Sequence, residues 1–245
     1  MMLPFMIHHE VGHHVLERAD GSATYSSKLY SILAAVNGPV EVSRRDELPE
    51  ETAIEVNIRP MSGVGGPRER WLETVVAGVL RSVLLVHMHP RTLVQVTLQV
   101  TKVPTLKLKN AFLDVAILPS LVNAAFLALV DGGLPLESTI SAALVAVFGK
   151  GISVDPEEME LELCSSVHAL AFTQHAEMLL NQSTGEFNIR NWEEGAERAE
   201  KACLAAMAPA GGDEEMANGE REARPWLRQE LEEKAKDAVA WKNDT

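Results

Sequence analysis

The feature that most constrains the fold is an apolar segment at residues 111–130. Its length is about that of a membrane-spanning helix. It contains Asp114, Pro119 and Asn123, however, and a proline inside a helix removes a hydrogen bond and breaks or kinks the helix. Proline is well tolerated in the first turn of a helix, and glycine often follows the last turn. We therefore expect a buried core helix that begins near Pro119 and ends at Gly132-Gly133, and no membrane span.

The residues on either side predict short strands and amphipathic helices. Alternating apolar residues are typical of strands, and apolar residues spaced by three and four are typical of helices. The order of these elements favours an α+β fold, with mixed or antiparallel sheets packed against helices, over a wound parallel sheet. The expected strands are 23–25, 31–42, 52–58, 91–100, 140–148, 152–154, 166–173 and 177–181, with a turn at 183–185, and the expected helices are 68–87, a helical pair within 108–132, and 191–207.

Composition divides the chain into three regions. Residues 1–14 form a histidine-rich N-terminal extension, residues 15–207 a single domain, and residues 208–245 an acidic linker followed by a charged helix. In this last helix Glu230–Lys234 and Glu232–Lys236 have the spacing of ion pairs one turn apart. Its apolar residues are sparse, so we expect an appendage that lies outside the core.

The net charge of −13 limits which nucleic-acid functions are plausible. A protein that grips nucleic acid alone needs a positive surface to displace counterions from the phosphates, and each third of this chain is net negative. Any RNA contact is therefore expected to be local, or shared with more basic partners. The two cysteines cannot form a disulfide framework, which favours a reducing compartment.

Two motifs suggest metal chemistry. The segment His9-Glu10-Val11-Gly12-His13 matches H-E-x-x-H, in which two histidines one helical turn apart bind zinc. The internal glycine and the position near the N-terminus argue against a closed zinc site, and leave adventitious metal binding by His8, His9, His13 and His14 as the open alternative. The acidic run at 155–162 has no histidine beside it, so we expect a solvated turn. His168 and His175 are expected to lie in strands.

A glycine-rich loop at residues 62–67 precedes the helix expected from residue 68. It lacks the lysine and the hydroxyl residue of a P-loop. One interpretation is a loop that carries Arg68 and Arg70 towards an RNA backbone. The other is a solvated loop whose arginines pair with Glu69 or Glu73. For Arg44-Arg45-Asp46-Glu47 we favour local ion pairing over RNA contact.

Several segments, taken in order, resemble the RNase PH family. They are Arg18–Ala23, Asn37–Val42, Arg44–Glu47, Ile54–Arg59, Gly63–Glu69, Val96–Val100, Asn123–Ala125 and Leu129–Pro135. The resemblance spans roughly residues 15–207, and it implies the fold of that family, which is like the second domain of ribosomal protein S5. Within the family, the chain is most similar to ring subunits of the eukaryotic RNA exosome, of fungal type.

This resemblance implies a set of partners and a location. The expected partners are other RNase PH-like ring subunits, cap proteins with RNA-binding domains, and RNA threaded through the central channel of a six-membered ring. The expected location is the nucleus and nucleolus, and also the cytoplasm. Arg68 matches an arginine at the start of the family's RNA-contacting helix, and Arg70 is its neighbour.

The departures from the family point away from catalysis. Active members bind phosphate through Asp-Gly-Gly-Thr-Arg after the strand that ends here near Val100, where this chain has Thr101-Lys102-Val103-Pro104-Thr105-Leu106. Their paired aspartates correspond to Leu161 and Val167. We therefore expect a non-catalytic structural subunit with no catalytic residue, no metal and no cofactor. The alternative is an active 3′–5′ phosphorolytic or hydrolytic ribonuclease that uses other residues.

Overall fold

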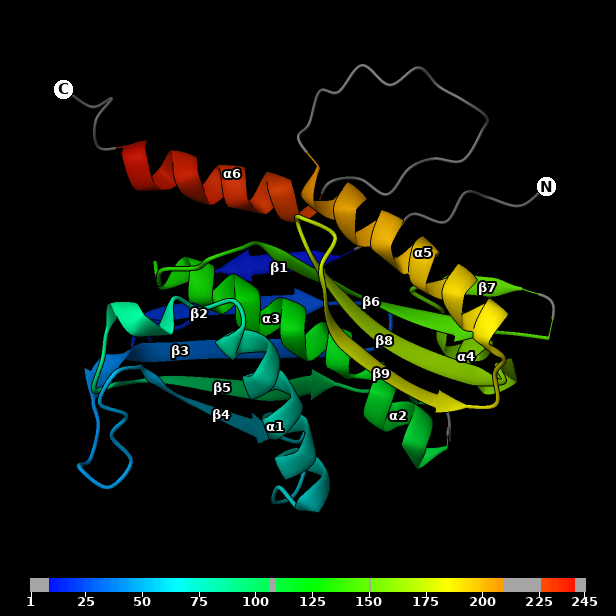
Figure 1. Cartoon of the computed structure of the whole chain (residues 1–245), viewed down its shortest axis with the longest axis horizontal. Coiled ribbons are helices and arrows are strands. Elements are labelled where there is room, and N and C mark those ends of the chain that lie inside the picture. The colour runs from blue at the N-terminus through cyan, green and yellow to red at the C-terminus, as the bar shows by residue number, and fades with distance from the viewer. Residues whose placement is uncertain (1–8, 106–108, 150, 209–225, 241–245) are drawn as a thin grey trace.

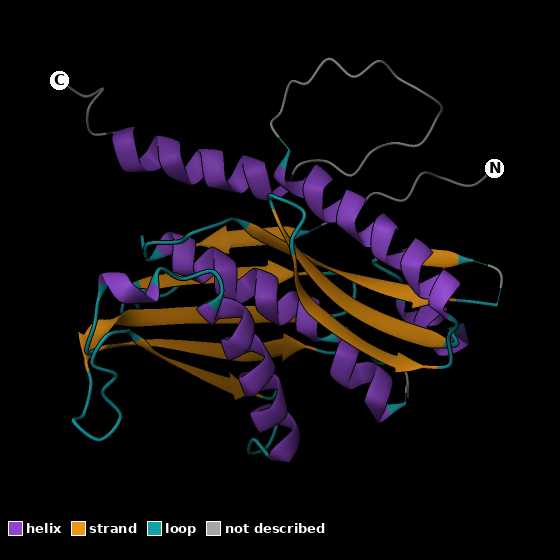
Figure 2. Cartoon of the chain, viewed as in Figure 1, coloured by secondary structure: helices purple, strands orange, loops and turns teal. Residues whose placement is uncertain are grey.

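The computed structural model describes residues 9–105, 109–149, 151–208 and 226–240. In this part of the chain, sheets and helices alternate in layers (Figures 1 and 2). A five-stranded sheet of order β1-β2-β3-β5-β4 packs on the central helix α3 (Leu118–Asp131), and a four-stranded sheet of order β7-β6-β8-β9 packs on the other side of that helix. Helix α5 (Ile189–Met207) covers the outer face of the second sheet. The expected α+β fold is confirmed.

The first sheet is antiparallel except at one edge, where β4 runs parallel to β5 through the crossover helix α1. Its elements are β1 (Glu10–His13), β2 (Gly21–Ser26), β3 (Ser31–Glu41), β4 (Ala53–Arg59), α1 (Pro67–Arg81) and β5 (Thr92–Lys102). Helix α1 ends before residue 87, where the sequence pattern had placed its end. The chain leaves the helix at Ser82 to bury Val83 and Leu84, and the carbonyl of Val83 accepts a hydrogen bond from Glu137 N at 2.8 Å. A short 3-10 helix, η1 (Val86–Met88), then leads into β5.

The second sheet is antiparallel throughout. Its strands are β6 (Ile140–Val147), β7 (Ile152–Val154), β8 (Ser166–Thr173) and β9 (Met178–Gly185), with α2 (Asn110–Ala116) and α4 (Glu158–Leu163) packed near it. The turn predicted at 183–185 is wrong, because Gly185 pairs with Ser166 inside the sheet. A Cβ at Gly185 would lie 2.3 Å from Ser165 O, so this glycine permits close strand approach. His168 lies in β8 as expected, whereas His175 lies in the turn before β9.

The apolar segment of the sequence forms helices α2 and α3. The stretch Asn110–Asp131 is apolar and long enough to cross a membrane, but 83% of its most apolar window is buried inside the domain. Helix α2 ends and helix α3 begins at Ile117, which is the C-cap of the first and the N-cap of the second. Pro119 lies in the first turn of α3. The buried core helix expected from the sequence is confirmed.

Both ends of the described chain pack onto the domain. Strand β1 pairs with β2, so the first sheet extends before the boundary expected at residue 15. The C-terminal helix α6 (Trp226–Val239) is not an appendage: Leu227 is 1% exposed, and the Trp226 ring lies 4.7 Å from that of His9. Apolar residues are few in α6, but Trp226 and Leu227 occupy its first turn and carry the contact. The linker at 209–225 lies outside the described residues.

Asp131, at the end of α3, joins three elements. Its buried carboxylate accepts hydrogen bonds from Ser22 N in β2 at 2.9 Å and from Lys234 Nζ in α6. Burial raises the pKa of Asp131, but the bonds from Lys234 and Ser22 outweigh that effect and leave the pKa below its ordinary value. The predicted pair of Lys234 with Glu230 is therefore replaced by a pair with Asp131. The second predicted pair is also replaced, because Glu232 accepts from Arg228 at 2.6 Å.

Asn123 ties the central helix to both sheets. Its Oδ1 accepts from Ala142 N at 2.9 Å, and its Nδ2 donates to Ala142 O at 2.9 Å and to the Tyr25 hydroxyl at 3.1 Å. Asn123 is 2% exposed, so these groups have no access to bulk water. Both backbone polar groups of Ala142 in β6 bond to this one amide, which also bonds to the Tyr25 hydroxyl on β2.

We predict that Asn123→Ala lowers the free energy of unfolding by about 2–4 kcal/mol, because it leaves buried donors and acceptors without partners. Urea denaturation of the purified chain measures this change. The control is Asn191→Ala on α5, whose side chain makes no hydrogen bond within the described chain and which should shift stability by about 0.5 kcal/mol or less. Equal stability of Asn123→Ala and wild type would contradict the bridging role.

Candidate nucleic-acid interface

The glycine-rich loop and the first turn of α1 place Arg68 and Arg70 differently. Gly66 caps α1, and its N–H donates to Glu69 Oε2 at 2.7 Å. Arg68 turns back towards the domain, where its guanidinium donates to Asp114 of α2 and lies 3.8 Å from Glu69. Arg70 is exposed, and its side chain makes no ion pair within the described residues. Of the two RNA-contact candidates, Arg70 therefore has the guanidinium available to a phosphate, and Arg68 is held by carboxylates.

The ion-pair interpretation of the sequence is confirmed for Arg68 and Glu69. Glu73 instead accepts a hydrogen bond from Ile58 N at 2.9 Å and fixes the edge strand to α1. In the other basic segment, Asp46 accepts from Ser43 Oγ at 2.8 Å, and Glu47 lies 3.3 Å from Arg91. The ion pairing expected for Arg44 and Arg45 is therefore not found in the described chain, because Asp46 bonds a serine hydroxyl and Glu47 approaches Arg91 instead.

A cleft of about 200 Å³ lies where the family's phosphate-binding segment is expected. Val103 and Pro104, from the segment that replaces the Asp-Gly-Gly-Thr-Arg motif, form part of its wall. Arg68 is the one cationic side chain of the lining in the part of the chain that the structure describes, and it is already paired with Asp114 and close to Glu69. The remaining lining is mostly apolar: Tyr30, Ile58, Pro60, Met61, Leu72, Val100, Leu113 and Ile117. Among the described residues of this cleft, a phosphate ion would find no unpaired cation and would face the carboxylate of Glu69.

The two positions that the sequence resemblance assigns to the family's catalytic aspartates lie in the core. Leu161 of α4 is 1% exposed and Val167 of β8 is fully buried. Neither side chain can ligate a metal ion or carry a proton. Within the described residues, no group of three or more histidine, cysteine, aspartate or glutamate side chains is placed to hold a metal ion.

The two histidines of the H-E-x-x-H match, His9 and His13, lie far apart because the segment between them is an extended strand. Residues four apart in a strand are about 13 Å apart, too far to share one metal ion. His9 packs against Tyr25 and Trp226, while His13 lies 3.4 Å from Glu230 and His14 lies 3.7 Å from Asp131. The zinc-protease interpretation fails because the segment is a strand and not a helix. His8 lies outside the described residues.

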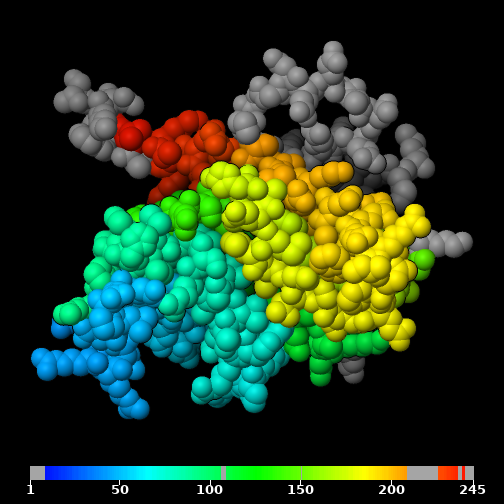
Figure 3. All heavy atoms as spheres, in the orientation of Figure 1, coloured from blue at the N-terminus to red at the C-terminus, as the bar shows by residue number. Residues whose placement is uncertain are grey.

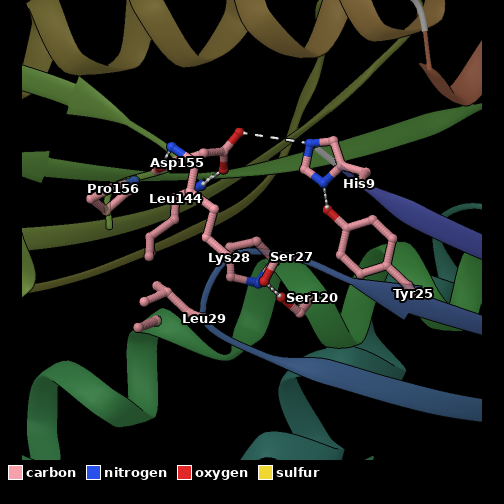
Figure 4. Close-up of a pocket in the computed structure, with 11 residues that line it drawn as sticks. His9, Tyr25, Ser27, Lys28, Leu29, Ser120, Leu144, Asp155 and Pro156 are labelled. Carbon is pink, nitrogen blue, oxygen red and sulfur yellow. Dashed lines mark hydrogen bonds and ion pairs between the residues drawn. The ribbon is translucent and has the colours of Figure 1, made fainter. Parts of the chain in front are cut away.

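A second, smaller cavity contains a polar cluster that the sequence did not reveal (Figure 4). The Tyr25 hydroxyl lies 2.8 Å from His9 Nδ1, and His9 Nε2 lies 3.9 Å from Asp155 Oδ2. Lys28 Nζ donates to the backbone carbonyl of Asp155 at 3.1 Å. The acidic run was expected to be solvated, but Asp155 points inwards and its side chain is 22% exposed. Nothing in the local sequence distinguishes this aspartate from the glutamates that follow it.

Burial changes the protonation of this cluster. It lowers the pKa of His9 to about 4, an effect that the charge of Lys28 reinforces. Burial also raises the pKa of Asp155 to about 6, although the Leu144 N–H and Lys28 both act to lower it. At neutral pH the pair is therefore a neutral imidazole beside a carboxylate, with Lys28 as the nearby cation. The cluster is a structural contact between the two sheets, with room for about one water molecule in a cavity of about 20 Å³.

The comparisons with known proteins agree with this fold. The model of the 3′ exoribonuclease (RNase PH) family, domain 1, matches residues 6–135. The Saccharomyces cerevisiae exosome complex component RRP46 is 35% identical over 187 residues, covering 73% of this chain and 82% of the relative. This chain belongs to the RNase PH family.

Other relatives support the same place within the RNase PH family. The Oryza sativa exosome complex exonuclease RRP46 homolog is 35% identical over 158 residues, covering 64% of this chain and 62% of the relative. The crystal structure of rice Rrp46 aligns with a TM-score of 0.68 at 29% identity over 79% of this chain and 88% of that chain. An Archaeoglobus fulgidus exosome chain aligns with a TM-score of 0.63 at 17% identity over 80% of this chain and 85% of that chain, which shows the shared fold. The resemblance to subunits of the eukaryotic RNA exosome is confirmed by these relatives named RRP46 from yeast and rice.

We predict that Asp155→Asn changes how stability depends on pH. The folded wild type holds the Asp155 proton up to about pH 6, whereas the unfolded chain releases it near 3.8, so this group costs stability as pH rises through that window. His9 acts with the opposite sign, because the unfolded chain takes up a proton below about 6.5 and the folded chain only below about 4. The stability of Asp155→Asn relative to wild type should therefore rise by up to about 3 kcal/mol between pH 4 and pH 7.

Urea denaturation at a series of pH values measures this relative stability. The double variant Asp155→Asn/His9→Gln is the control, because it removes both groups and should lose both slopes. A difference between Asp155→Asn and wild type that is the same at pH 4 and pH 7 would show that Asp155 is solvated.

Proposed function

We propose that the chain is a structural subunit of an RNA exosome ring that supports 3′–5′ RNA processing and decay without catalysing it. The observation that carries this proposal is the burial of Leu161 and Val167 at the catalytic positions of an otherwise complete RNase PH fold. Phosphorolysis needs an oriented phosphate and stabilisation of developing charge. Within the described residues the lining of the cleft has one cation, Arg68, which pairs with the carboxylates of Asp114 and Glu69.

The relatives support the assembly proposed here. Several are named exosome complex components, and the solved structures that share the fold include an archaeal exosome core. We propose that this chain pairs with other RNase PH-like ring subunits, lies beneath cap proteins with RNA-binding domains, and helps to line a channel for RNA. We further propose that it acts in the nucleus, the nucleolus and the cytoplasm.

A second candidate function is 3′–5′ exonuclease activity. The rice and Arabidopsis thaliana relatives are named exosome complex exonuclease RRP46 homologs, which keeps this reading open. It would need acids other than the family's pair. In the described region the one carboxylate that lines the cleft, Glu69, and the nearby Asp114 are both engaged with Arg68.

We predict that the purified chain does not shorten RNA. Labelled single-stranded RNA would be incubated with the chain, with and without inorganic phosphate and with Mg²⁺ or Mn²⁺, beside an active RNase PH enzyme as positive control. The expected result is no release of nucleotide above the buffer blank. Phosphate-dependent release of nucleoside diphosphates would establish the second candidate function instead.

We predict that Arg70→Glu in the assembled complex reduces ultraviolet cross-linking of RNA to this chain by about tenfold, because it replaces an exposed phosphate contact with a like charge. Arg18→Glu is the matched control, since Arg18 is exposed and makes no ion pair in the described chain. Arg68→Gln should have a smaller effect than Arg70→Glu, because Asp114 already occupies its guanidinium. Unchanged cross-linking for Arg70→Glu would place the RNA path elsewhere.

A further inference from the structure

Four large apolar side chains are exposed at one end of the second sheet. Met159 and Leu163 of α4 are 72% and 78% exposed, and Phe187 and Ile189, between β9 and α5, are 44% and 69% exposed. Scattered apolar residues are normal on a protein surface, whereas several at one place rimmed by charged residues mark an interaction site. We call these four residues, together with Glu158, Glu162 and Glu186, the acidic-apolar end.

Hydrogen bonds and pairing bring these segments to the same end of the sheet. Helix α4 leads into the start of β8, and β9 ends beside it, where Gly185 pairs with Ser166. Glu186 N donates to Ser165 O at 3.0 Å, which fixes the start of the loop to α5. The ring of Phe187 lies 4.6 Å from that of His168 in β8. In Figures 1 and 3 the end of β9 and the first turn of α5 lie together at the right-hand side of the molecule.

The exposed residues are not needed by the core that lies beside them. Helix α4 buries Leu161, while Met159 and Leu163, four residues apart, share the opposite face. Helix α5 packs on the sheet through Ala199 and Cys203 further along its length. The domain is therefore complete without covering Met159, Leu163 or Ile189.

The charge around these residues is negative. Glu162 and Glu186 are exposed and form no ion pair within the described chain, and Glu158 accepts a hydrogen bond from Thr105 Oγ1 at 3.0 Å. Among the described residues the cations at this end are fewer: Arg190 is exposed beside Ile189, and Lys109 lies close enough to Cys164 to lower the pKa of its thiol. An apolar centre with an acidic rim fits a partner surface of apolar side chains surrounded by lysine and arginine.

We propose that the acidic-apolar end is the surface through which this chain docks one neighbouring RNase PH-like chain, whose facing surface is apolar and basic. This inference rests on the proposed ring function and assigns one face to it. A second copy of this chain fits less well, because a two-fold contact would bring the same carboxylates together. RNA is disfavoured by the same negative charge.

The test uses the full-length tagged chain, purified gently from its own cells, with the co-purifying RNase PH-like chains identified and quantified by mass spectrometry. Leu163→Glu and Ile189→Glu, singly and together, should reduce recovery of one such chain by about tenfold, because each places a charge in an apolar contact. The control is Met88→Glu, on η1 in the first sheet's connections and 55% exposed in the wild type, which should keep recovery within about twofold of wild type. Thermal denaturation of each purified variant shows whether it folds.

A second set of variants tests the glutamates of the acidic-apolar end separately from its apolar residues. Glu162→Lys/Glu186→Lys should lower recovery of the same neighbour, whereas Glu50→Lys, at an exposed site in the first sheet's connections, should not. A zero-length carboxyl–amine cross-linker should join Glu162 or Glu186 of the wild type to lysines of that neighbour.

The outcomes separate this inference from the ring role. If the folded Leu163→Glu/Ile189→Glu variant recovers every RNase PH-like chain at the wild-type level, the docking face is overturned and the ring role stands. If the variant loses self-association instead, a second copy is the occupant and the inference is overturned. If the wild type itself recovers no RNase PH-like chain, the proposed function fails.

Discussion

The domain depends on one buried amide between its two sheets. Helix α3 is buried around its whole circumference and is mostly apolar, so hydrophobic burial alone, which has no direction, would hold it between the sheets without fixing its rotation. Asn123 supplies that specificity, because it bonds to both polar groups of Ala142 in β6 and to the Tyr25 hydroxyl on β2. A buried amide with all its partners in place orients the layers that pack around it.

The polar network that begins at Asn123 extends to both ends of the described chain. Tyr25 contacts His9 at the N-terminal end, and His9 in turn lies beside Asp155 and the ring of Trp226 in α6. Asp131, at the C-terminal end of α3, forms an ion pair with Lys234 of α6. Helix α6 is thus held at its first turn by aromatic contacts with His9 and Tyr25, and further along by the ion pair with Asp131. These partners are all far from α6 in the sequence.

The candidate interface combines the family fold with a cleft that offers little for binding phosphate. The cleft near α1 contains an arginine, but Asp114 and Glu69 pair with it, and apolar side chains form most of the wall where the sequence resemblance places the phosphate-binding segment. The negative charge of the chain makes an independent grip on RNA unfavourable and makes contacts with basic partners favourable. Both effects are consistent with a subunit whose role is performed within an assembly.

The sequence by itself determined the central helix, most strands, the family resemblance and the apolar residues at the catalytic positions, because periodicity, proline and glycine placement, and motif order are local properties. It could not determine that Asp155 turns inwards, that Arg68 is paired with Asp114, or that α6 docks on β1 and α3. Each of these depends on partners tens of residues away, and burial and charge pairing are set only when the layers pack. The H-E-x-x-H segment was likewise not decided by its own residues. Its spacing suits a metal site on a helix, but pairing with β2 makes the segment a strand.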